Sequence, residues 1–325
     1  MSFNRFPVKK SLCGLALAFS VSLATQAADL IVGDQSYNAR TVMEAAGVLK
    51  DVPYTLEWKQ FTAGSPVAEA LNVGSLDVGL LGDAPALFMG ALGAPIKVIG
   101  VSRQNLEGVA IVVAKDSPIK TVADLKGKKV AIWKGSFSQQ LMLTALDKAG
   151  VPRDAVEYRY LSALDSSHAL DGGSVDAIAT WDPYVTQQER QGSRVIATAK
   201  GLIPAQSFIV ANDRAIKDKR AQIADFLQRL QTARAWSVAS AQNTDTYANA
   251  WSALTKADAE VARRWFERSQ TVVVPVDAQV IAQAQQTIDF FNGAGLTKSY
   301  PAGNVFDDSF SAELTSAAAP AQAIR

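Results

Sequence analysis

A short phrase occurs twice in the chain. Residues 74–85 read GSLDVGLLGDAP, and residues 173–184 read GSVDAIATWDPY. In each copy a glycine closes a helical stretch, an apolar run typical of a buried strand follows, and an Asp with a Pro close behind it opens the next helix. Each copy therefore predicts one strand-to-helix junction of an α/β unit.

The segments around the two copies repeat in the same order. Strands are predicted over 28–33, 52–61, 76–82 and 96–102, and again over 128–133, 151–161, 175–181 and 193–198. Helical stretches separate them, and such alternation requires a parallel sheet with helices on both faces. We therefore expect two parallel-sheet α/β lobes of one design. The alternative is that any two α/β segments look alike, because Gly and Asp-Pro punctuate helices generally.

The length of the chain also favours two lobes, because 325 residues are too many for one comfortable core. Two further apolar runs, 109–118 and 205–214, lead out of the two halves and predict strands that cross between the lobes. The expected division is a signal segment, a discontinuous first lobe and an inserted second lobe. Their bounds are 1–27 for the signal, 28–113 and 211–325 for lobe I, and 114–210 for lobe II.

The N-terminus has the pattern of a secretory signal. Arg5, Lys9 and Lys10 precede the apolar run SLCGLALAFSVSL, and Thr25-Gln26-Ala27 offers small residues for cleavage. The run is too short to span a bilayer, and an uncleaved anchor would need a longer one. We expect residues 1–27 to be removed and the mature protein to reach the periplasm.

Composition excludes several kinds of function. Cys13, the one cysteine, lies in the signal, so the mature chain offers no disulfide, thiolate metal ligand or Cys nucleophile. Removing three basic residues from 32 leaves 29 against 31 acidic residues, and this balance does not suggest nucleic acid or a membrane surface as a partner. His168, the one histidine, falls on a predicted helix and reads as a solvated position. We predict no metal, no cofactor and no enzyme activity.

The repeated phrase places helix starts at the carboxyl ends of strands, where ligands bind in open α/β sheets. Unpaired N–H groups and the helix dipole make such a start an anion site. Asp83 and Ala84 mark one start and Asp182 marks another, while Ser136 opens a third helix with capping-box spacing to Gln139. Plain helix capping is the alternative role for each Asp and Ser.

Neighbouring residues complete the candidate site. Gln35 and Ser36 follow the first strand, and Phe137 and Trp181 bring aromatic rings beside the donors. Arg103, just after the strand over 96–102, offers a charged contact, with a solvated loop position as its alternative. The combination favours an oxyanion with an organic tail.

The segments GSLDVGLLGDAP, GAPIKVIG, DSPIKTVADLKGKKVA, KGSFSQQLMLTALDKAG and GGSVDAIATWDPY together resemble the periplasmic substrate-binding proteins of ABC transporters for sulfonates. The wider group binds taurine, nitrate and sulfate esters. The resemblance implies a type II periplasmic-binding-protein fold whose two lobes are joined by two crossover strands. It also implies sulfonate oxygens held by amides at Ala84, Ser136 and Phe137, with Gln35 and Trp181 beside the ligand.

The same resemblance implies a function and its partners. We expect a monomer that binds an alkanesulfonate and delivers it to a membrane permease whose separate ATPase subunit drives import. Relatives often carry Thr where this chain has Ala84, so one hydroxyl donor is missing and the preference among these anions stays open. Some proteins of this fold are desulfinases that rely on a reactive cysteine, and an enzyme acting on an organosulfur compound is the alternative from another class.

Overall fold

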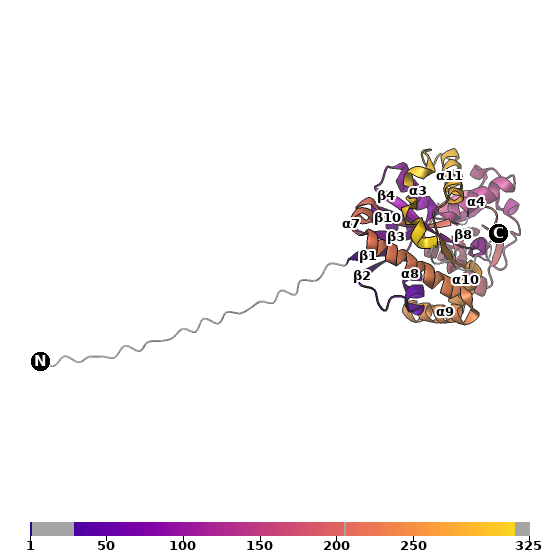
Figure 1. Ribbon diagram of the computed structural model, residues 1–325. Helices are drawn as coiled ribbons and strands as arrows, with labels where there is room; N and C mark the ends of the chain where they lie inside the picture. Colours follow the sequence, from indigo (N-terminus) through magenta and orange to yellow (C-terminus); the bar gives the residue numbers. More distant parts are fainter. Residues whose placement is uncertain (2–28, 205, 316–325) are drawn as a thin grey trace.

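The computed structural model describes Met1 and residues 29–204 and 206–315 (Figure 1). The expected signal segment lies outside the described residues, Met1 aside. The strands are β1 (Leu30–Gln35), β2 (Leu56–Phe61), β3 (Val78–Gly82), β4 (Ile96–Arg103), β5 (Val109–Val113), β6 (Lys129–Ile132), β7 (Glu157–Tyr160), β8 (Ala177–Trp181), β9 (Arg194–Thr198), β10 (Gln206–Asn212) and β11 (Val272–Val274). The α-helices are α1 (Asn38–Ala45), α2 (Gly64–Asn72), α3 (Asp83–Ala91), α4 (Phe137–Lys148), α5 (Ala163–Asp171), α6 (Tyr184–Arg190), α7 (Asp213–Asp218), α8 (Arg220–Ala239), α9 (Ala241–Thr255), α10 (Ala259–Ser269), α11 (Ala278–Gly293) and α12 (Ser311–Thr315).

The strands form two sheets of matching design. The first has the order β11-β4-β10-β3-β1-β2 and the second has the order β7-β6-β8-β5-β9. In the first, β1 runs parallel to β2 and β3, and β10 lies antiparallel between β3 and β4. In the second, β6 runs parallel to β7 and β8, and β5 lies antiparallel between β8 and β9. The prediction of two α/β lobes is confirmed, but the sheets are mixed instead of parallel throughout.

The antiparallel strands follow directly from the two crossings of the chain. It leaves the first sheet after Arg103 and enters the second at Val109, then leaves after Thr198 and re-enters the first at Gln206. Each incoming strand therefore pairs along its whole length within one sheet. Residues 109–113, expected in lobe I, pair in the second sheet, and residues 206–210, expected in lobe II, pair in the first.

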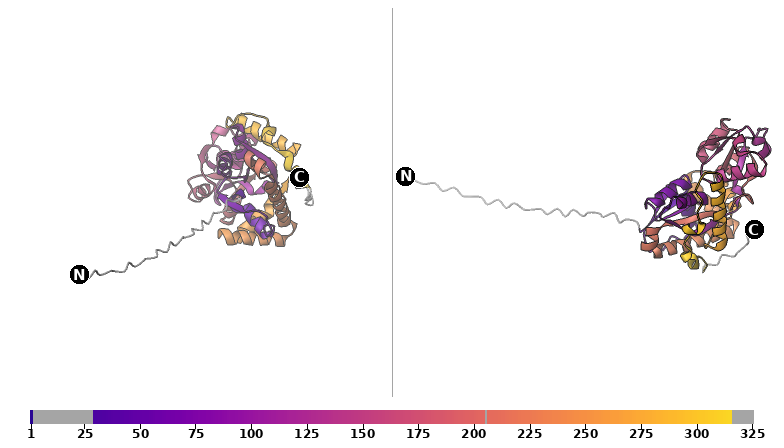
Figure 2. Two further views of the ribbon diagram at one scale, coloured as in Figure 1. Left: turned by 60° about the vertical axis from the view of Figure 1, so that its left-hand side comes forward. Right: turned by 90° about the horizontal axis from the view of Figure 1, so that it is seen from above.

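Helices cover both faces of both sheets. On the first sheet, α1, α8, α9 and α10 pack on one face and α2, α3 and α11 on the other. On the second sheet, α4 packs on one face and α5 and α6 on the other. In the right-hand view of Figure 2, the magenta second lobe stands apart from the indigo and orange elements of the first. Within the described ranges, no helix is both long and apolar enough to cross a membrane.

Two glycines let α2 lie unusually close to the first sheet. A Cβ at Gly79 would come within 2.6 Å of Val67 in α2, and one at Gly33 would come within 3.3 Å of the same side chain. The strands β1 and β3 that carry these glycines are central and buried, so a larger side chain would push the helix away. The close packing sets the start of α2 directly over the carboxyl end of β3.

Candidate functional site

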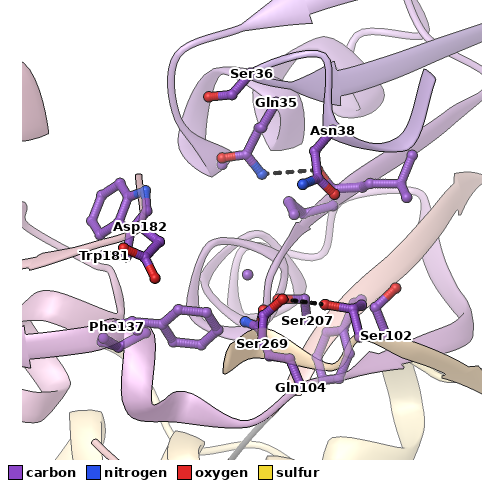
Figure 3. A pocket seen from close by; sticks show the side chains of 18 of the residues that line it. Gln35, Ser36, Asn38, Ser102, Gln104, Phe137, Trp181, Asp182, Ser207 and Ser269 are labelled. Atoms are coloured by element: carbon purple, nitrogen blue, oxygen red, sulfur yellow. Dashed lines mark hydrogen bonds between the residues drawn. The ribbon is translucent and has the colours of Figure 1, made fainter. Parts of the chain in front are cut away.

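A cleft lies between the two lobes, where the strands of both sheets end. The first lobe and the crossing before β5 line it with Asp34, Gln35, Ser36, Asn38, Thr62, Gly64, Leu80, Leu81, Gly82, Pro85, Ser102, Gln104, Asn105, Gly108, Ser207, Phe208, Arg234, Trp265, Ser269 and Thr271. The second lobe contributes Val109, Ser136, Phe137, Trp181 and Asp182. We call this space the interlobe cleft. Figure 3 shows side chains from both lobes converging on it.

Six of the nine site residues predicted from the sequence line the interlobe cleft, and they come from both lobes. They are Gln35, Ser36, Ser136, Phe137, Trp181 and Asp182. The Nε2 group of Gln35 donates to the carbonyl of Leu80 at 2.9 Å, which fixes its amide at the end of β1. The ring of Phe137 crosses to the first lobe, where it would lie 3.5 Å from a Cβ at Gly82.

Ser36 and Tyr37 hold the turn between β1 and α1 in a left-handed conformation, with φ of 53° and 58°. Side chains from the C-terminal helices fix this turn. The indole Nε1 of Trp251 donates to the carbonyl of Ser36 at 2.6 Å, and the hydroxyl of Tyr247 donates to the carbonyl of Asn38 at 2.8 Å. The first loop of the cleft is therefore braced by helices more than 200 residues away in sequence.

Asp182 lies in the cleft wall, but its carboxylate is already engaged. Arg268 of α10 places its Nε 2.7 Å from Oδ2, and the N–H and hydroxyl of Thr186 donate to Oδ1 at 3.0 and 2.8 Å. Burial raises the pKa of Asp182, while the Arg268 charge lowers it. Because Arg268 belongs to the first lobe, this carboxylate joins the lobes.

Asp83, Ala84 and Arg103 do not line the cleft. Asp83 and Ala84 are fully buried, and the Asp83 carboxylate accepts the Ala84 N–H at 2.7 Å and the Thr287 hydroxyl at 3.2 Å. Burial raises the pKa of Asp83 to about 7. Arg103 extends toward Asp277, 3.9 Å away. The N–H of Ala84, expected to hold the anion, is thus occupied by its own neighbour.

Besides the start of α1, whose N–H groups at Ala39 and Arg40 are occupied by the Asp34 carboxylate, two helix starts face the cleft without an acidic residue in their first turn. They belong to α2, which begins at Gly64, and α4, which begins at Phe137. Ser136 caps α4 by accepting the N–H of Ser138, and the N–H of Phe137 has no partner among the described residues. A Cβ at Gly64 would lie 3.5 Å from the backbone N of Gly82, the residue that the Phe137 ring approaches. The positive ends of two helices, one from each lobe, therefore border the same cleft: α2 lies close to Gly82 at its backbone, and α4 reaches Gly82 with the ring of Phe137.

Arg234 is the cationic residue among the described residues that line the cleft. It lies on α8 with 4% of its surface exposed, donates to the hydroxyl of Tyr247 at 3.3 Å and bonds Asn38 Oδ1. The nearby Asp34 carboxylate is engaged by the N–H groups of Ala39 and Arg40 and by that of Gln35. Arg234 could not be predicted as a cleft residue from the sequence, because the pattern of apolar residues in α8 indicates only a helix that packs on the core.

The described residues hold no group of three or more His, Cys, Asp or Glu side chains that could bind a metal ion. His168 is exposed on α5 and does not line the interlobe cleft. The two carboxylates in the cleft wall, Asp34 and Asp182, both accept hydrogen bonds from the protein itself. The cleft is therefore equipped to bind an anion by hydrogen bonds and helix dipoles.

Two α/β lobes whose strand orders correspond, apart from the additional β11 of the first, and a donor-rich cleft between them define the class of periplasmic binding proteins. A family model described as NMT1/THI5 like matches residues 55–244. The chain belongs to this family.

Individual relatives resemble the chain over most of its length. A curated relative from Escherichia coli (strain K12), named for aliphatic sulfonates, is 35% identical over 290 residues, which are 87% of this chain and 90% of the relative. The crystal structure of the periplasmic aliphatic sulphonate binding protein from Escherichia coli matches with a TM-score of 0.78 and 34% identity, covering 86% and 91% of the two chains. The alkanesulfonate-binding protein from Xanthomonas axonopodis pv. citri, bound to MOPS, matches with a TM-score of 0.77 and 29% identity, covering 85% and 97%. The resemblance stated from the sequence is confirmed.

The same fold also occurs in an enzyme. The desulfurization enzyme DSZB matches with a TM-score of 0.64 at 15% identity, covering 88% of this chain and 98% of the enzyme. At this identity the match concerns the fold alone. The residues in the cleft, and not the fold, must therefore distinguish binding from catalysis.

Proposed function

We propose that this protein binds a small organic sulfonate in the interlobe cleft and delivers it to an ABC importer. The observation that carries the proposal is that two helix starts, that of α2 from the first lobe and that of α4 from the second, line the same cleft between the lobes. The similarity to aliphatic sulfonate-binding proteins supports the same ligand class. The signal-like residues 1–27 support export to the periplasm, where a monomer would meet its permease.

In this proposal the sulfonate lies beside Gly82, between the N–H groups of Gly64 and Phe137. The positive charge of Arg234 adds to the field in the cleft, and the rings of Trp181 and Trp265 border the organic tail. Each hydrogen bond to a charged group contributes about 1.5–3 kcal/mol net. Four such bonds, less the cost of ordering and closing the lobes, reach the roughly 8 kcal/mol of a micromolar complex.

Binding without turnover is part of the proposal. Helix-start amides orient the sulfonate but cannot attack it, and the mature chain has no cysteine to serve as a nucleophile. The alternative is an enzyme on the same fold that converts an organosulfur compound. Incubation of the pure protein with each ligand, followed by mass analysis, separates the two, because turnover of any compound would contradict the binding role.

The ligand class is tested by calorimetric titration of the protein without residues 1–27. The panel contains propane-1-sulfonate, taurine, an aryl sulfonate, a sulfate ester and nitrate. We expect saturable binding of one ligand per chain for the propane-1-sulfonate and weaker or no binding for nitrate. Tight binding of nitrate or a sulfate ester with no response to any sulfonate would replace the proposed ligand.

A further inference from the structure

A second group of polar side chains lies at another edge of the interlobe cleft. It comprises Ser102, Gln104, Ser207, Ser269 and Thr271, and we call it the hydroxyl cluster. Figure 3 shows four of these residues gathered below, well separated from Gln35, Ser36 and Asn38 above. The cluster belongs to the β10, β4 and β11 side of the first sheet, whereas the start of α2 lies over β3.

Strand register builds this cluster. Ser102 of β4 pairs directly with Ser207 at the start of the antiparallel strand β10, so both hydroxyls reach the same end of the sheet. Ser269 and Thr271 lie just before β11, which is also antiparallel to β4. Arg103, the residue after Ser102, does not line the cleft and extends toward Asp277. Because side chains alternate between the two faces of a strand, the neutral Ser102 faces the cleft and the charged Arg103 faces away from it.

The hydrogen-bonding capacity of the cluster is only partly used by the protein. The hydroxyls of Ser102 and Ser207 and the amide of Gln104 have no partner among the described residues. Ser102 is nevertheless a buried residue, with 7% of its surface exposed. The hydroxyls of Ser269 and Thr271 already take part in hydrogen bonds within the protein. Thr271 Oγ1 donates to Ser269 Oγ, and Ser269 Oγ donates to the carbonyl of Phe266, each at 3.4 Å. Polar groups of buried residues are normally hydrogen-bonded, so the hydroxyl of the buried Ser102, with that of the partly buried Ser207 beside it, is suited to a ligand group.

The cluster carries no formal charge. The two carboxylates of the cleft wall are Asp34, which three backbone N–H groups occupy, and Asp182, which Arg268 and Thr186 occupy. Neither is free to neutralise an ammonium group on a ligand, and no cation stands within the cluster to accept a carboxylate. Serine hydroxyls and a glutamine amide match a neutral group that donates and accepts hydrogen bonds.

We propose that the hydroxyl cluster is a second subsite, which binds a neutral hydroxyl, ether or amide group at the far end of the sulfonate. The inference rests on the proposed function, because it takes the sulfonate position at the helix starts as given. Ser207 pairs with Gly82 and lies one strand spacing, or about 5 Å, from the sulfonate position, whereas Ser102 on β4 lies two spacings, or about 10 Å, from it, so Ser102 marks the far end of the ligand. A hydrogen bond of about 3 Å at each end leaves a bridge of about two or three carbons. Short hydroxyalkanesulfonates are the ligands of this shape.

The test compares ligands that differ only at the far end. The protein without residues 1–27 is titrated by calorimetry with propane-1-sulfonate, 3-hydroxypropane-1-sulfonate, 3-aminopropane-1-sulfonate and 3-sulfopropanoate. One or two net hydrogen bonds predict about three- to tenfold tighter binding of the hydroxy compound than of the plain alkane. The amino and carboxylate compounds should bind more weakly than the hydroxy compound, because their charges lose water without gaining a counter-charge.

The variant Ser102→Ala/Ser207→Ala should bring the ratio of hydroxy to plain affinity close to one. Ser75→Ala, at an exposed turn outside the cleft, is the matched control and should keep the wild-type ratio. An unchanged ratio in the double variant, or tightest binding of the amino or carboxylate compound, would overturn the subsite while leaving sulfonate binding intact. Failure of every sulfonate to bind would overturn the proposed function itself.

Discussion

Asp83 and Asp182, the aspartates of the repeated phrase, direct their carboxylates to the protein itself. Asp83 accepts the N–H of Ala84 at the start of α3, and Asp182 accepts the N–H of Thr186 in α6. A carboxylate at a helix start neutralises the positive end of the dipole, so these two starts are poorly suited to a ligand anion. The phrase occurs twice because each lobe needs the same strand-to-helix junction.

The buried carboxyl of Asp83 predicts a pH dependence of stability. Its pKa rises from 3.8 to about 7 in the folded protein, so between these values the native state keeps a proton that the unfolded chain releases. The free energy of unfolding should therefore fall as the pH rises from 4 through 7. In Asp83→Asn this loss should shrink by on the order of a few kcal/mol, since one pKa unit corresponds to about 1.4 kcal/mol. Urea unfolding at pH 5 and pH 8 measures it, and equal losses in both proteins would contradict the assignment.

The N–H of Phe137 can be removed without disturbing α4. Proline suits the first helical position, and Ser136 before it is already extended, with φ −138° and ψ 174°. Phe137→Ala removes the ring alone, so Phe137→Pro compared with Phe137→Ala isolates the donor. We expect the Pro variant to bind the sulfonate about 10- to 100-fold more weakly than the Ala variant. Calorimetry measures the ratio, and equal affinities with intact folding would exclude this amide from the site.

At the scale of elements, α10 of the first lobe and α6 of the second are joined by ion pairs. Arg268 contacts Asp182 and Glu189, Arg264 contacts Glu189 at 3.3 Å, and Arg190 contacts Asp258 at the start of α10 at 2.7 Å. The pair of Arg268 and Asp182 is the buried one, with side chains 13% and 1% exposed. It links closure of the lobes to the cleft wall.

Breaking this pair from one side should weaken binding. Arg268→Met leaves the Asp182 carboxylate buried without its cation, beside a ligand of the same charge, and we expect about tenfold lower affinity. The double variant Arg268→Met/Asp182→Asn removes both charges and should bind more tightly than the single variant. Titration of both with propane-1-sulfonate checks the order, and a single variant with wild-type affinity would show that the pair plays no part in closure.

The sequence predicted the alternating strands and helices well, because the spacing of apolar residues and the Gly and Pro residues at helix ends are local signals. It could not predict that β5 and β10 run antiparallel, since strand direction depends on pairing with distant strands. Ser136 and Phe137, which line the cleft, could be proposed from the sequence because the capping-box spacing of Ser136 and Gln139 marks the start of their helix. Arg234 and Gly64 were not predicted. Arg234 lies on α8, whose sequence pattern indicates only a helix that packs on the core, and Gly64 begins the helix that follows the edge strand β2.

For the whole molecule, contacts join the lobes on the side opposite α10 as well. Gln140 of α4 lies 3.4 Å from the hydroxyl of Thr287 in α11, and the guanidinium of Arg153 lies 5.0 Å from the centre of the Phe290 ring. With the ion pairs of α10, these contacts frame the cleft from two sides. Among the described residues, the chain crosses between the lobes twice, between β4 and β5 and between β9 and β10, so hinge motion about these two connections would open the cleft.

Ligand-linked closure predicts a change in overall size. Small-angle scattering should give a smaller radius of gyration with saturating propane-1-sulfonate than without it, because the ligand binds both lobes and shifts the population to the closed form. The variant Phe137→Pro at the same ligand concentration serves as the control and should contract less. An identical radius with and without ligand, at proven saturation, would show that the lobes do not move on binding.

The central claim is that amides at two helix starts, one from each lobe, hold the anion. Amide NMR of the ¹⁵N-labelled protein during titration with propane-1-sulfonate tests it most directly. The account predicts that the N–H resonances of Gly64 and Phe137 move downfield together and saturate at one ligand per chain, while that of Ala84, bonded to Asp83, moves little. Saturable binding that shifts neither Gly64 nor Phe137 would contradict it.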